Sequence, residues 1–292
     1  MTSTGVADKA IPCLAIDIGA SKVDVALVDE DGSVKTRGRL DVASNVDRLF
    51  DAVVELVRDT VKDTDYAVVG VGCAGPMTNQ GEFVSPLNIA AWREFPLRGR
   101  LRDALGHDVF VDGDARALAL AEGRFGAARA SNSYLSMVVS TGVGGAFVID
   151  GRLLDGDTGN AGHIGHLNVI PGGRLCSCGS YGCLEAEVSG WAIEDMTGRP
   201  AQFADASTRQ RCATLVGRAV GTLSSVLDFT RCYIAGSVAL GYGDEFFDAA
   251  NKAAHELAMM RYNEHLEIKR SGLGGDGPLL GAAVVGWRGD VR

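Results

Sequence analysis

Hydrophobic and polar positions alternate with two different periods along this chain, and the first of them is the period of a β-strand. The residues CLAIDIG form an apolar run, and KVDVALVDEDG then places Val23, Val25 and Leu27 at every second position. Apolar residues at every second position are typical of a half-buried strand. The segment 13–32 is therefore predicted to be two strands joined by a tight glycine turn and closed by an Asp-Gly turn.

The period changes to that of a helix from Val46 onwards. Apolar residues recur at intervals of three and four positions as far as Val57, with Asp and Arg between them. This spacing predicts an amphipathic helix over about 45–62. The residues YAVVGVGCAG then predict another buried strand, and HDVFVDGDARALALAEGRFG predicts a strand, a turn and a helix.

The second half of the chain repeats the order of elements in the first. The residues YLSMVVSTGVGGAFVIDG give an apolar strand, a turn of small residues, a second strand and an Asp-Gly turn, as LAIDIGASKVDVALVDEDG does at the start. A helix over about 209–227, the strand CYIAGS and a helix over about 244–261 follow. We predict a duplicated α/β fold whose two halves pack closely around a cleft.

The composition is that of a folded acidic protein. With 292 residues, 46% of them hydrophobic, the chain can form one large core or two ordinary ones. A formal net charge of −9 repels nucleic-acid phosphates and anionic lipids, so neither class of partner is expected. No export signal precedes the first strand, and no run of about 18 apolar residues predicts a membrane span, so a cytoplasmic location is expected.

Turns containing glycine occupy equivalent places in the two halves. Glycine lets backbone N–H groups approach a ligand closely, and successive N–H groups form a concave site for phosphate oxygens. DIGASK and STGVGG could together hold a nucleotide, and IAGS repeats the pattern after a later strand; the alternative for each is an ordinary turn. The candidate cofactor-binding residues are Asp17, Gly19, Ala20, Ser21, Lys22, Thr141, Gly142, Gly144, Gly236 and Ser237.

Carboxylates are expected beside the predicted cleft. Asp17 is placed to hold Mg²⁺ through water, since this ion favours one or two carboxylates together with phosphates. Asp112 and Asp114 lie at a strand-to-helix turn, where Asp114 could accept the proton of a substrate hydroxyl that attacks a γ-phosphate. The structural alternative is that Asp114 only caps its helix.

A cluster of metal-binding residue types is the most specific feature of the sequence. Cys176, Cys178 and Cys183 follow His166, and three thiolates with one imidazole form a closed tetrahedral set for Zn²⁺. Closed sets are usually structural, so the ion is expected to order the loop over 163–187. A redox dithiol is the alternative, and it leaves the third cysteine and the histidine unexplained. The scattered cysteines elsewhere are expected to be buried thiols.

The order of these motifs resembles the ROK (repressor, open reading frame, kinase) family of sugar kinases over nearly the whole chain. The most specific part is the run from GHIGH to CSCGSYGCLE, which resembles the family's signature and zinc motifs. DIGASK, STGVGG and IAGS resemble its nucleotide-binding motifs, SPLNIAAW its sugar-binding segment and GDARALALAEG its catalytic segment. The resemblance implies an ATP-dependent hexose kinase of the actin/hexokinase fold, in which two RNase H-like lobes close over sugar and nucleotide.

The resemblance also implies roles for individual residues. Asp114 becomes the general base for phosphoryl transfer to a primary hydroxyl, O6 of the sugar. The expected sugar ligands are Asn88, His166 and Glu185, and the expected sugar site also includes Gly75, Gly113 and His163. The expected zinc ligands are His166, Cys176, Cys178 and Cys183. The lobes are expected to span 1–113, completed by a helix at 279–292, and 114–278.

Two positions depart from the pattern of the family's glucose kinases. His163 stands where those kinases usually have glutamate, and Gly113 where they usually have asparagine. A carboxylate accepts hydrogen bonds from two hydroxyls, whereas a neutral imidazole offers one donor and one acceptor. Since a site that pairs specific hydroxyls discriminates strongly, N-acetylmannosamine, N-acetylglucosamine, other amino sugars and mannose are alternatives to glucose.

Other classes of function are less well supported by the sequence. A sugar-responsive regulator would need a helix-turn-helix domain ahead of DIGASK, which begins at position 17, and the acidic charge disfavours DNA contact. A non-catalytic sugar-binding protein would not need the phosphate turns. The phosphoryl donor could be ATP or polyphosphate, and the resemblance implies a homodimer or homotetramer.

Overall fold

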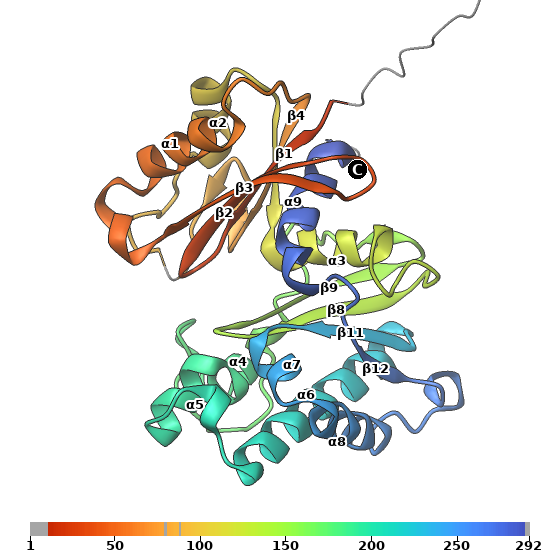
Figure 1. Cartoon of the computed structure of the whole chain (residues 1–292). Helices are drawn as coiled ribbons and strands as arrows, with labels where there is room; N and C mark the ends of the chain where they lie inside the picture. The colour runs from red at the N-terminus through yellow and green to blue at the C-terminus, as the bar shows by residue number, and fades with distance from the viewer. Residues whose placement is uncertain (1–10, 79–80, 88, 290–292) are drawn as a thin grey trace, which may run out of the picture.

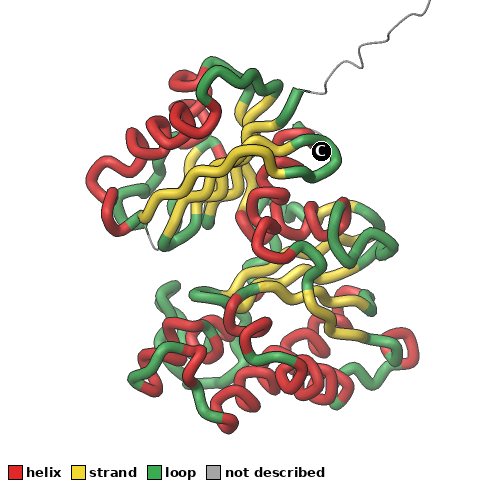
Figure 2. The backbone as a smooth tube through the Cα atoms, viewed as in Figure 1, coloured by secondary structure: helices red, strands yellow, loops and turns green. Residues whose placement is uncertain are grey.

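The computed structural model describes residues 11–78, 81–87 and 89–289, and within them two five-stranded sheets form the frame of the molecule (Figures 1 and 2). The first sheet has the order β3-β2-β1-β4-β7 and the second the order β10-β9-β8-β11-β12. The strands of the first are β1 (Cys13–Ile18), β2 (Lys22–Val28), β3 (Val34–Asp41), β4 (Val68–Cys73) and β7 (Val109–Gly113). Those of the second are β8 (Tyr134–Val139), β9 (Val143–Ile149), β10 (Arg152–Leu153), β11 (Arg231–Ala235) and β12 (Glu267–Arg270).

The two sheets have the same topology. In the first, β1 pairs antiparallel with β2 and parallel with β4, and β4 pairs parallel with β7. In the second, β8 pairs antiparallel with β9 and parallel with β11, and β11 pairs parallel with β12. The predicted duplication and the α/β class are therefore confirmed. A short hairpin of β5 (Met77–Thr78) and β6 (Phe83–Val84) follows β4.

The helices of the first half cover both faces of its sheet. They are α1 (Leu49–Val61), α2 (Leu97–Leu105) and α3 (Asp114–Arg124), and the last helix of the described chain, α9 (Gly277–Arg288), joins them. The predicted helix over 45–62 begins at Leu49, because the residues before it form a 3-10 helix, Ala43–Arg48. The last described helix contacts β1, β4 and α3, so the first strand and the last helix of the described chain meet at this sheet (Figure 1).

The helices of the second half lie mainly on the outer face of its sheet. They are α4 (Leu184–Val188), α5 (Gly190–Thr197), α6 (Ala206–Leu227), α7 (Ser237–Gly241) and α8 (Asp244–His255). The predicted helix over 244–261 ends at His255, and residues 261–263 form a separate 3-10 helix. Further 3-10 helices are Ile164–His166, Ala201–Phe203 and Gly274–Asp276.

The four cysteines outside the metal-ligand cluster are buried, as expected. They are Cys13, Cys73, Cys212 and Cys232, each fully shielded from solvent and surrounded by apolar side chains. Burial raises the pKa of the Cys212 thiol to about 11, so this group stays protonated at neutral pH. None of the described helices is long and apolar enough to cross a membrane.

Candidate active site

A cavity of about 530 Å³ is lined by residues of both halves of the molecule. The β1–β2 turn, the chain after β4, the β7–α3 junction, the β8–β9 turn and the start of α4 all contribute to its walls. The structure thus brings together most of the residues predicted to form the site. The predicted residues that line it are Asp17, Gly19, Ala20, Ser21, Gly75, Gly113, Asp114, Thr141, Gly142, Gly144, His163, His166, Cys178 and Glu185.

Other predicted residues lie away from the cavity wall. Lys22 forms an ion pair with Asp24, at 3.2 Å between Nζ and Oδ2. Ser237 Oγ lies 3.0 Å from Ser140 Oγ, and Ser140 does line the cavity, so the IAGS turn borders its edge. Gly236, beside Ser237, does not line the cavity, and neither do the predicted metal ligands Cys176 and Cys183. Asn88 lies outside the described residues.

Asp114 is the first residue of α3 and faces the cavity from the end of β7. Its Oδ1 accepts a hydrogen bond of 2.7 Å from the N–H of Ala115, so the side chain is held at the helix N-terminus. The side chain is open to solvent at the cavity, and desolvation by the surrounding protein raises the pKa of the Asp114 carboxyl. The neighbouring His163 opposes this shift, and the charge of Glu185 adds to it. A desolvated carboxylate of this kind is a stronger base than an exposed one.

Asp17 lies in β1, on the same side of the cavity as Asp114. Burial, together with the negative charges of Asp114 and Asp24, raises the pKa of the Asp17 carboxyl to about 7, and the positive charge of Lys22 opposes this shift. When two carboxyl groups lie close together, the charge of one opposes ionisation of the other. A bound cation stabilises the state in which both are ionised. The residues present at this end of the cavity therefore fit a Mg²⁺ ion held through water beside nucleotide phosphates.

The two glycine turns have the tight geometry that their sequences predict. In the first, the N–H of Gly19 donates to the carbonyl of Lys22 at 3.0 Å, and in the second, the N–H of Ser140 donates to the carbonyl of Gly142 at 2.9 Å. A side chain at Gly142 would meet Glu185, because an ideal Cβ there would lie 2.8 Å from Oε2. Small residues at these turns leave the backbone open to the cavity.

Glu185 connects the metal-ligand loop to the second phosphate turn. It lies in the first turn of α4, and its Oε2 accepts a hydrogen bond of 2.9 Å from the N–H of Val143, the first residue of β9. The same carboxylate lines the cavity. The predicted sugar ligand Glu185 and the predicted phosphate turn are thus joined by one hydrogen bond.

The cysteine cluster has the spacing of a tetrahedral zinc site. The candidate ligand atoms of His166, Cys176, Cys178 and Cys183 all lie within 4.8 Å of one another. His166 Nδ1 lies 3.5 Å from Cys176 Sγ, and Cys178 Sγ lies 3.7 Å from Cys183 Sγ. Zn–S bonds of about 2.3 Å and Zn–N bonds of about 2.1 Å place tetrahedral ligands about 3.6–3.8 Å apart, so these residues fit the ion.

The orientation of His166 matches the double role predicted for it. Its Nδ1 belongs to the ligand cluster, and the residue also lines the cavity, so Nε2 is the nitrogen left for a substrate. A metal on one ring nitrogen fixes the ring and leaves a proton on the other. His163 lies beside it, with the ring centroids 6.1 Å apart, and burial together with His166 lowers the pKa of the His163 imidazole.

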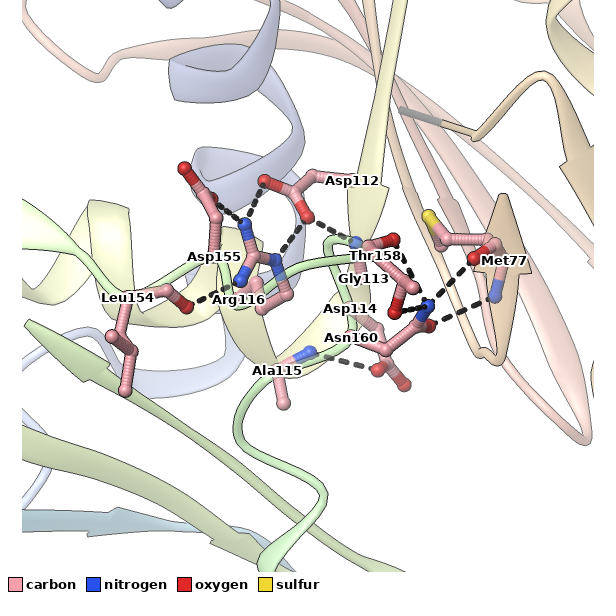
Figure 3. A network of polar contacts seen from close by, with 10 residues as sticks. All are labelled: Met77, Asp112, Gly113, Asp114, Ala115, Arg116, Leu154, Asp155, Thr158 and Asn160. Carbon is pink, nitrogen blue, oxygen red and sulfur yellow. Dashed lines mark hydrogen bonds and ion pairs between the residues drawn. The ribbon is translucent and has the colours of Figure 1, made fainter. Parts of the chain in front are cut away.

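Arg116, which the sequence did not indicate as a site residue, occupies part of the space that a side chain at position 113 would fill. An ideal Cβ at Gly113 would lie 3.2 Å from Cδ of Arg116, which also lines the cavity. The Arg116 guanidinium is engaged with the carboxylates of Asp112 and Asp155 (Figure 3). A larger side chain at position 113 would therefore have to displace the side chain of Arg116.

Asn160 is a second cavity residue that sequence reasoning missed. Its side-chain amide forms two hydrogen bonds with the backbone of Met77, which belongs to the first half of the chain (Figure 3). No local sequence pattern predicts such a contact, because the partner is a main-chain group 83 positions away in the chain. Glycines on both sides of Asn160 are the only local signal of an unusual turn.

Comparison with known proteins identifies the family. The model of the ROK family matches residues 13–287. A glucokinase from Streptomyces coelicolor is 31% identical over 180 residues, and this match covers 62% of the chain but only 57% of that relative. An N-acetylmannosamine kinase from Pasteurella multocida is 30% identical over 290 residues, covering 93% of the chain and 95% of that enzyme.

A solved structure agrees with the fold. The crystal structure of a ROK family glucokinase from Streptomyces griseus, in complex with glucose and AMPPNP, has a TM-score of 0.84 and 26% sequence identity, covering 95% of this chain and 100% of that one. The actin/hexokinase-like fold expected from the sequence is therefore confirmed. From the family match across both halves, the full-length relatives and this structural agreement, we conclude that the chain belongs to the ROK family of sugar kinases and related proteins.

Proposed function

We propose that the protein transfers the γ-phosphoryl group of ATP to the primary hydroxyl, O6, of a hexose. The observation that supports this most directly is the shared cavity, in which Asp114 and both glycine turns face the same space. A base, a phosphate cradle and polar sugar ligands in one cavity are the parts that phosphoryl transfer requires. A non-catalytic sugar-binding protein would not need the first two.

Asp114 would act as the general base in this reaction. Its raised pKa makes the carboxylate a better acceptor for the proton of the attacking hydroxyl. The backbone N–H groups of the two turns would hold the phosphates in line, and Asp17 would hold Mg²⁺, which supplies charge neutralisation when bound. His166 and Glu185 would orient sugar hydroxyls, and zinc on His166 and the three cysteines would keep that wall rigid.

A second candidate substrate is N-acetylmannosamine, and one residue of the cavity favours it. His163 replaces the glutamate of glucose kinases, and its lowered pKa keeps the imidazole neutral near pH 7. A neutral imidazole offers one donor and one acceptor, which complements the carbonyl and N–H of an acetamido group. A relative that matches 93% of this chain and 95% of its own length is also named N-acetylmannosamine kinase.

A coupled assay of ADP release tests both candidates. Glucose, mannose, glucosamine, N-acetylglucosamine and N-acetylmannosamine are each offered with MgATP. In parallel reactions with polyphosphate as the alternative donor, which release no ADP, formation of the sugar phosphate is measured instead. The proposal expects ADP release to depend on one of these sugars, with the product phosphorylated at O6 by ³¹P and ¹³C NMR. Strong preference for N-acetylmannosamine selects the second candidate. ADP release that no sugar stimulates would contradict the kinase proposal.

We also propose the arrangement of the chain into lobes and its assembly. The first lobe would comprise residues up to 113 together with the C-terminal helix, because α9 contacts β1 and β4 of the first sheet. The second would comprise 114–278. A homodimer or homotetramer is proposed from the family resemblance, and light scattering coupled to size-exclusion chromatography would measure it.

A further inference from the structure

The segment 154–163 leads from the second sheet to the cavity. It begins after β10, contributes the 159–163 portion to the cavity wall and ends at His163. Two polar contacts tie it to other parts of the molecule, one at each end (Figure 3). The contact near His163 is the one that reaches Met77, after β4, in the proposed lobe of residues up to 113.

Arg116 holds the beginning of the segment. Its Nη1 donates to the carbonyl of Leu154 at 2.8 Å, and its Nη2 forms an ion pair with Asp155. Its Nε donates to Oδ1 of Asp112 at 2.5 Å, and the arginine side chain is only 9% exposed. Arg116 is the third residue of α3, the helix that starts with Asp114. The start of the segment is therefore fixed to the element that carries the candidate base.

Asn160 holds the other end, and its amide pairs with both backbone groups of Met77. The N–H of Met77 donates to Asn160 Oδ1 at 3.1 Å, and Asn160 Nδ2 donates to the carbonyl of Met77 at 2.8 Å. Nδ2 also donates to the carbonyl oxygen of Thr158 at 3.1 Å, which orients the amide. Only a side chain with both a donor and an acceptor can make this pair.

The pair fixes two walls of the cavity against each other. Met77 follows Gly75 and Pro76, and the position of an ideal Cβ on Gly75 lies 3.3 Å from Cε1 of His163. Gly75, Met77, Asn160 and His163 all line the cavity. If the halves move apart here, both hydrogen bonds to Asn160 break and Gly75 loses its contact with His163.

We propose that Asn160 is a positioning residue that latches the two halves together at the sugar end of the cavity. This inference rests on the proposed kinase function for its catalytic consequence, although the latch itself does not. A latch that favours the closed arrangement raises sugar affinity by increasing the fraction of molecules that are ready to bind. At saturating sugar concentration, the bound sugar itself holds the two halves in the closed arrangement. The kcat then no longer depends on the latch.

The variants Asn160→Asp and Asn160→Ala test the proposal kinetically. Aspartate keeps the shape and the acceptor but cannot donate to the Met77 carbonyl, and alanine loses both groups. We expect the KM for sugar to rise about tenfold, the change that the loss of one to two net hydrogen bonds gives, with kcat and the KM for ATP within about twofold of wild type. Asp157→Asn, an exposed change in the same segment, should leave all three values unchanged.

Hydrogen exchange at the amide of Met77 tests the latch without any catalysis. In the sugar-free protein this amide should exchange about tenfold faster in Asn160→Ala than in wild type, since its acceptor is removed. Equal exchange in the two proteins would overturn the latch, and so would an unchanged KM for sugar or a loss confined to kcat. Absence of sugar-stimulated ADP release in wild type would instead remove the kinase proposal, while the exchange result still decides on the latch.

Discussion

At the scale of single residues, the cavity is organised by polar side chains that bind the main chain of a distant segment. Glu185 accepts from the N–H of Val143, and Asn160 pairs with both backbone groups of Met77. Each such bond satisfies a backbone group that would otherwise face the cavity unpaired. Glu185 and Asn160 each line the cavity and also bind the backbone of another segment. A substitution of either residue therefore alters both places at once.

Replacing Asp114 by asparagine should separate binding from turnover. The amide keeps the size of the side chain but cannot take up the proton of a sugar hydroxyl, so kcat should fall by about 10²–10⁴-fold. Sugar binding, measured by calorimetry without nucleotide, should stay within a few-fold of wild type because the base contributes little to the ground state. Unchanged turnover in this variant would remove the assignment of Asp114 as the base.

The raised pKa of Asp114 has a consequence for the pH dependence of the reaction. The base must be deprotonated, and burial stabilises its protonated form, so activity should be lost as pH falls through a value above the usual 3.8 of an aspartate. The acid limb of kcat/KM for sugar measures this value in the free enzyme. Circular dichroism at each pH establishes that the protein stays folded. An acid limb at the position of an ordinary carboxyl would contradict the predicted direction.

At the scale of elements, local patterns predicted the strands and turns well and the ends of some helices poorly. The repeats of DIGASK and STGVGG placed two hairpins that the structure contains at 13–28 and 134–149. The helix predicted to run to 261 ends at His255, although neither Gly nor Pro follows it directly. Tertiary contacts determine this end, since Asn263 Nδ2 donates to Ser225 Oγ of α6 at 2.9 Å and Tyr262 donates to the Ser225 carbonyl.

The cysteine loop is the element whose order should depend most on a metal. Its hydrogen bonds are mostly within the loop, such as that from the N–H of Cys176 to the carbonyl of Ser180, so few apolar contacts hold it. Cys183→Ser or chelation should therefore release about one Zn²⁺ per chain and weaken sugar affinity at least tenfold, with a smaller effect on nucleotide affinity.

Elemental analysis and calorimetry measure these two quantities. Ser180→Ala is the matched control in the same loop, because only the backbone of Ser180 takes part in the contact with Cys176. This variant should keep its metal and its sugar affinity. Sugar affinity that survives complete removal of the metal would contradict a structural role for zinc at the cavity wall.

At the scale of the whole molecule, the duplicated topology explains why a cavity forms between turns that are 123 positions apart, at 17 and 140. Equivalent β-hairpins in the two halves present equivalent turns, and these turns line one cavity. The sequence predicted this symmetry because the two hairpins share a pattern. It did not predict the contacts of Asn160 and Arg116, which depend on how the halves are packed together rather than on any repeat.

β4 of the first sheet packs against α9, the last helix of the described chain. A single methyl group added at this contact should disrupt it. An ideal Cβ at Gly70 would lie 1.9 Å from the carbonyl oxygen of Ala282 and 2.6 Å from the backbone nitrogen of Gly286. Backbone atoms cannot move aside as a flexible side chain can, so Gly70→Ala should displace the helix and cost about 3 kcal/mol of unfolding free energy.

Gly99→Ala, where no atom lies within 4 Å of the added methyl, is the matched control. It should leave stability unchanged or raise it by about 0.5 kcal/mol, because alanine is the better helix former. Urea unfolding of both variants measures the difference, and equal midpoints would show that α9 does not complete the first sheet.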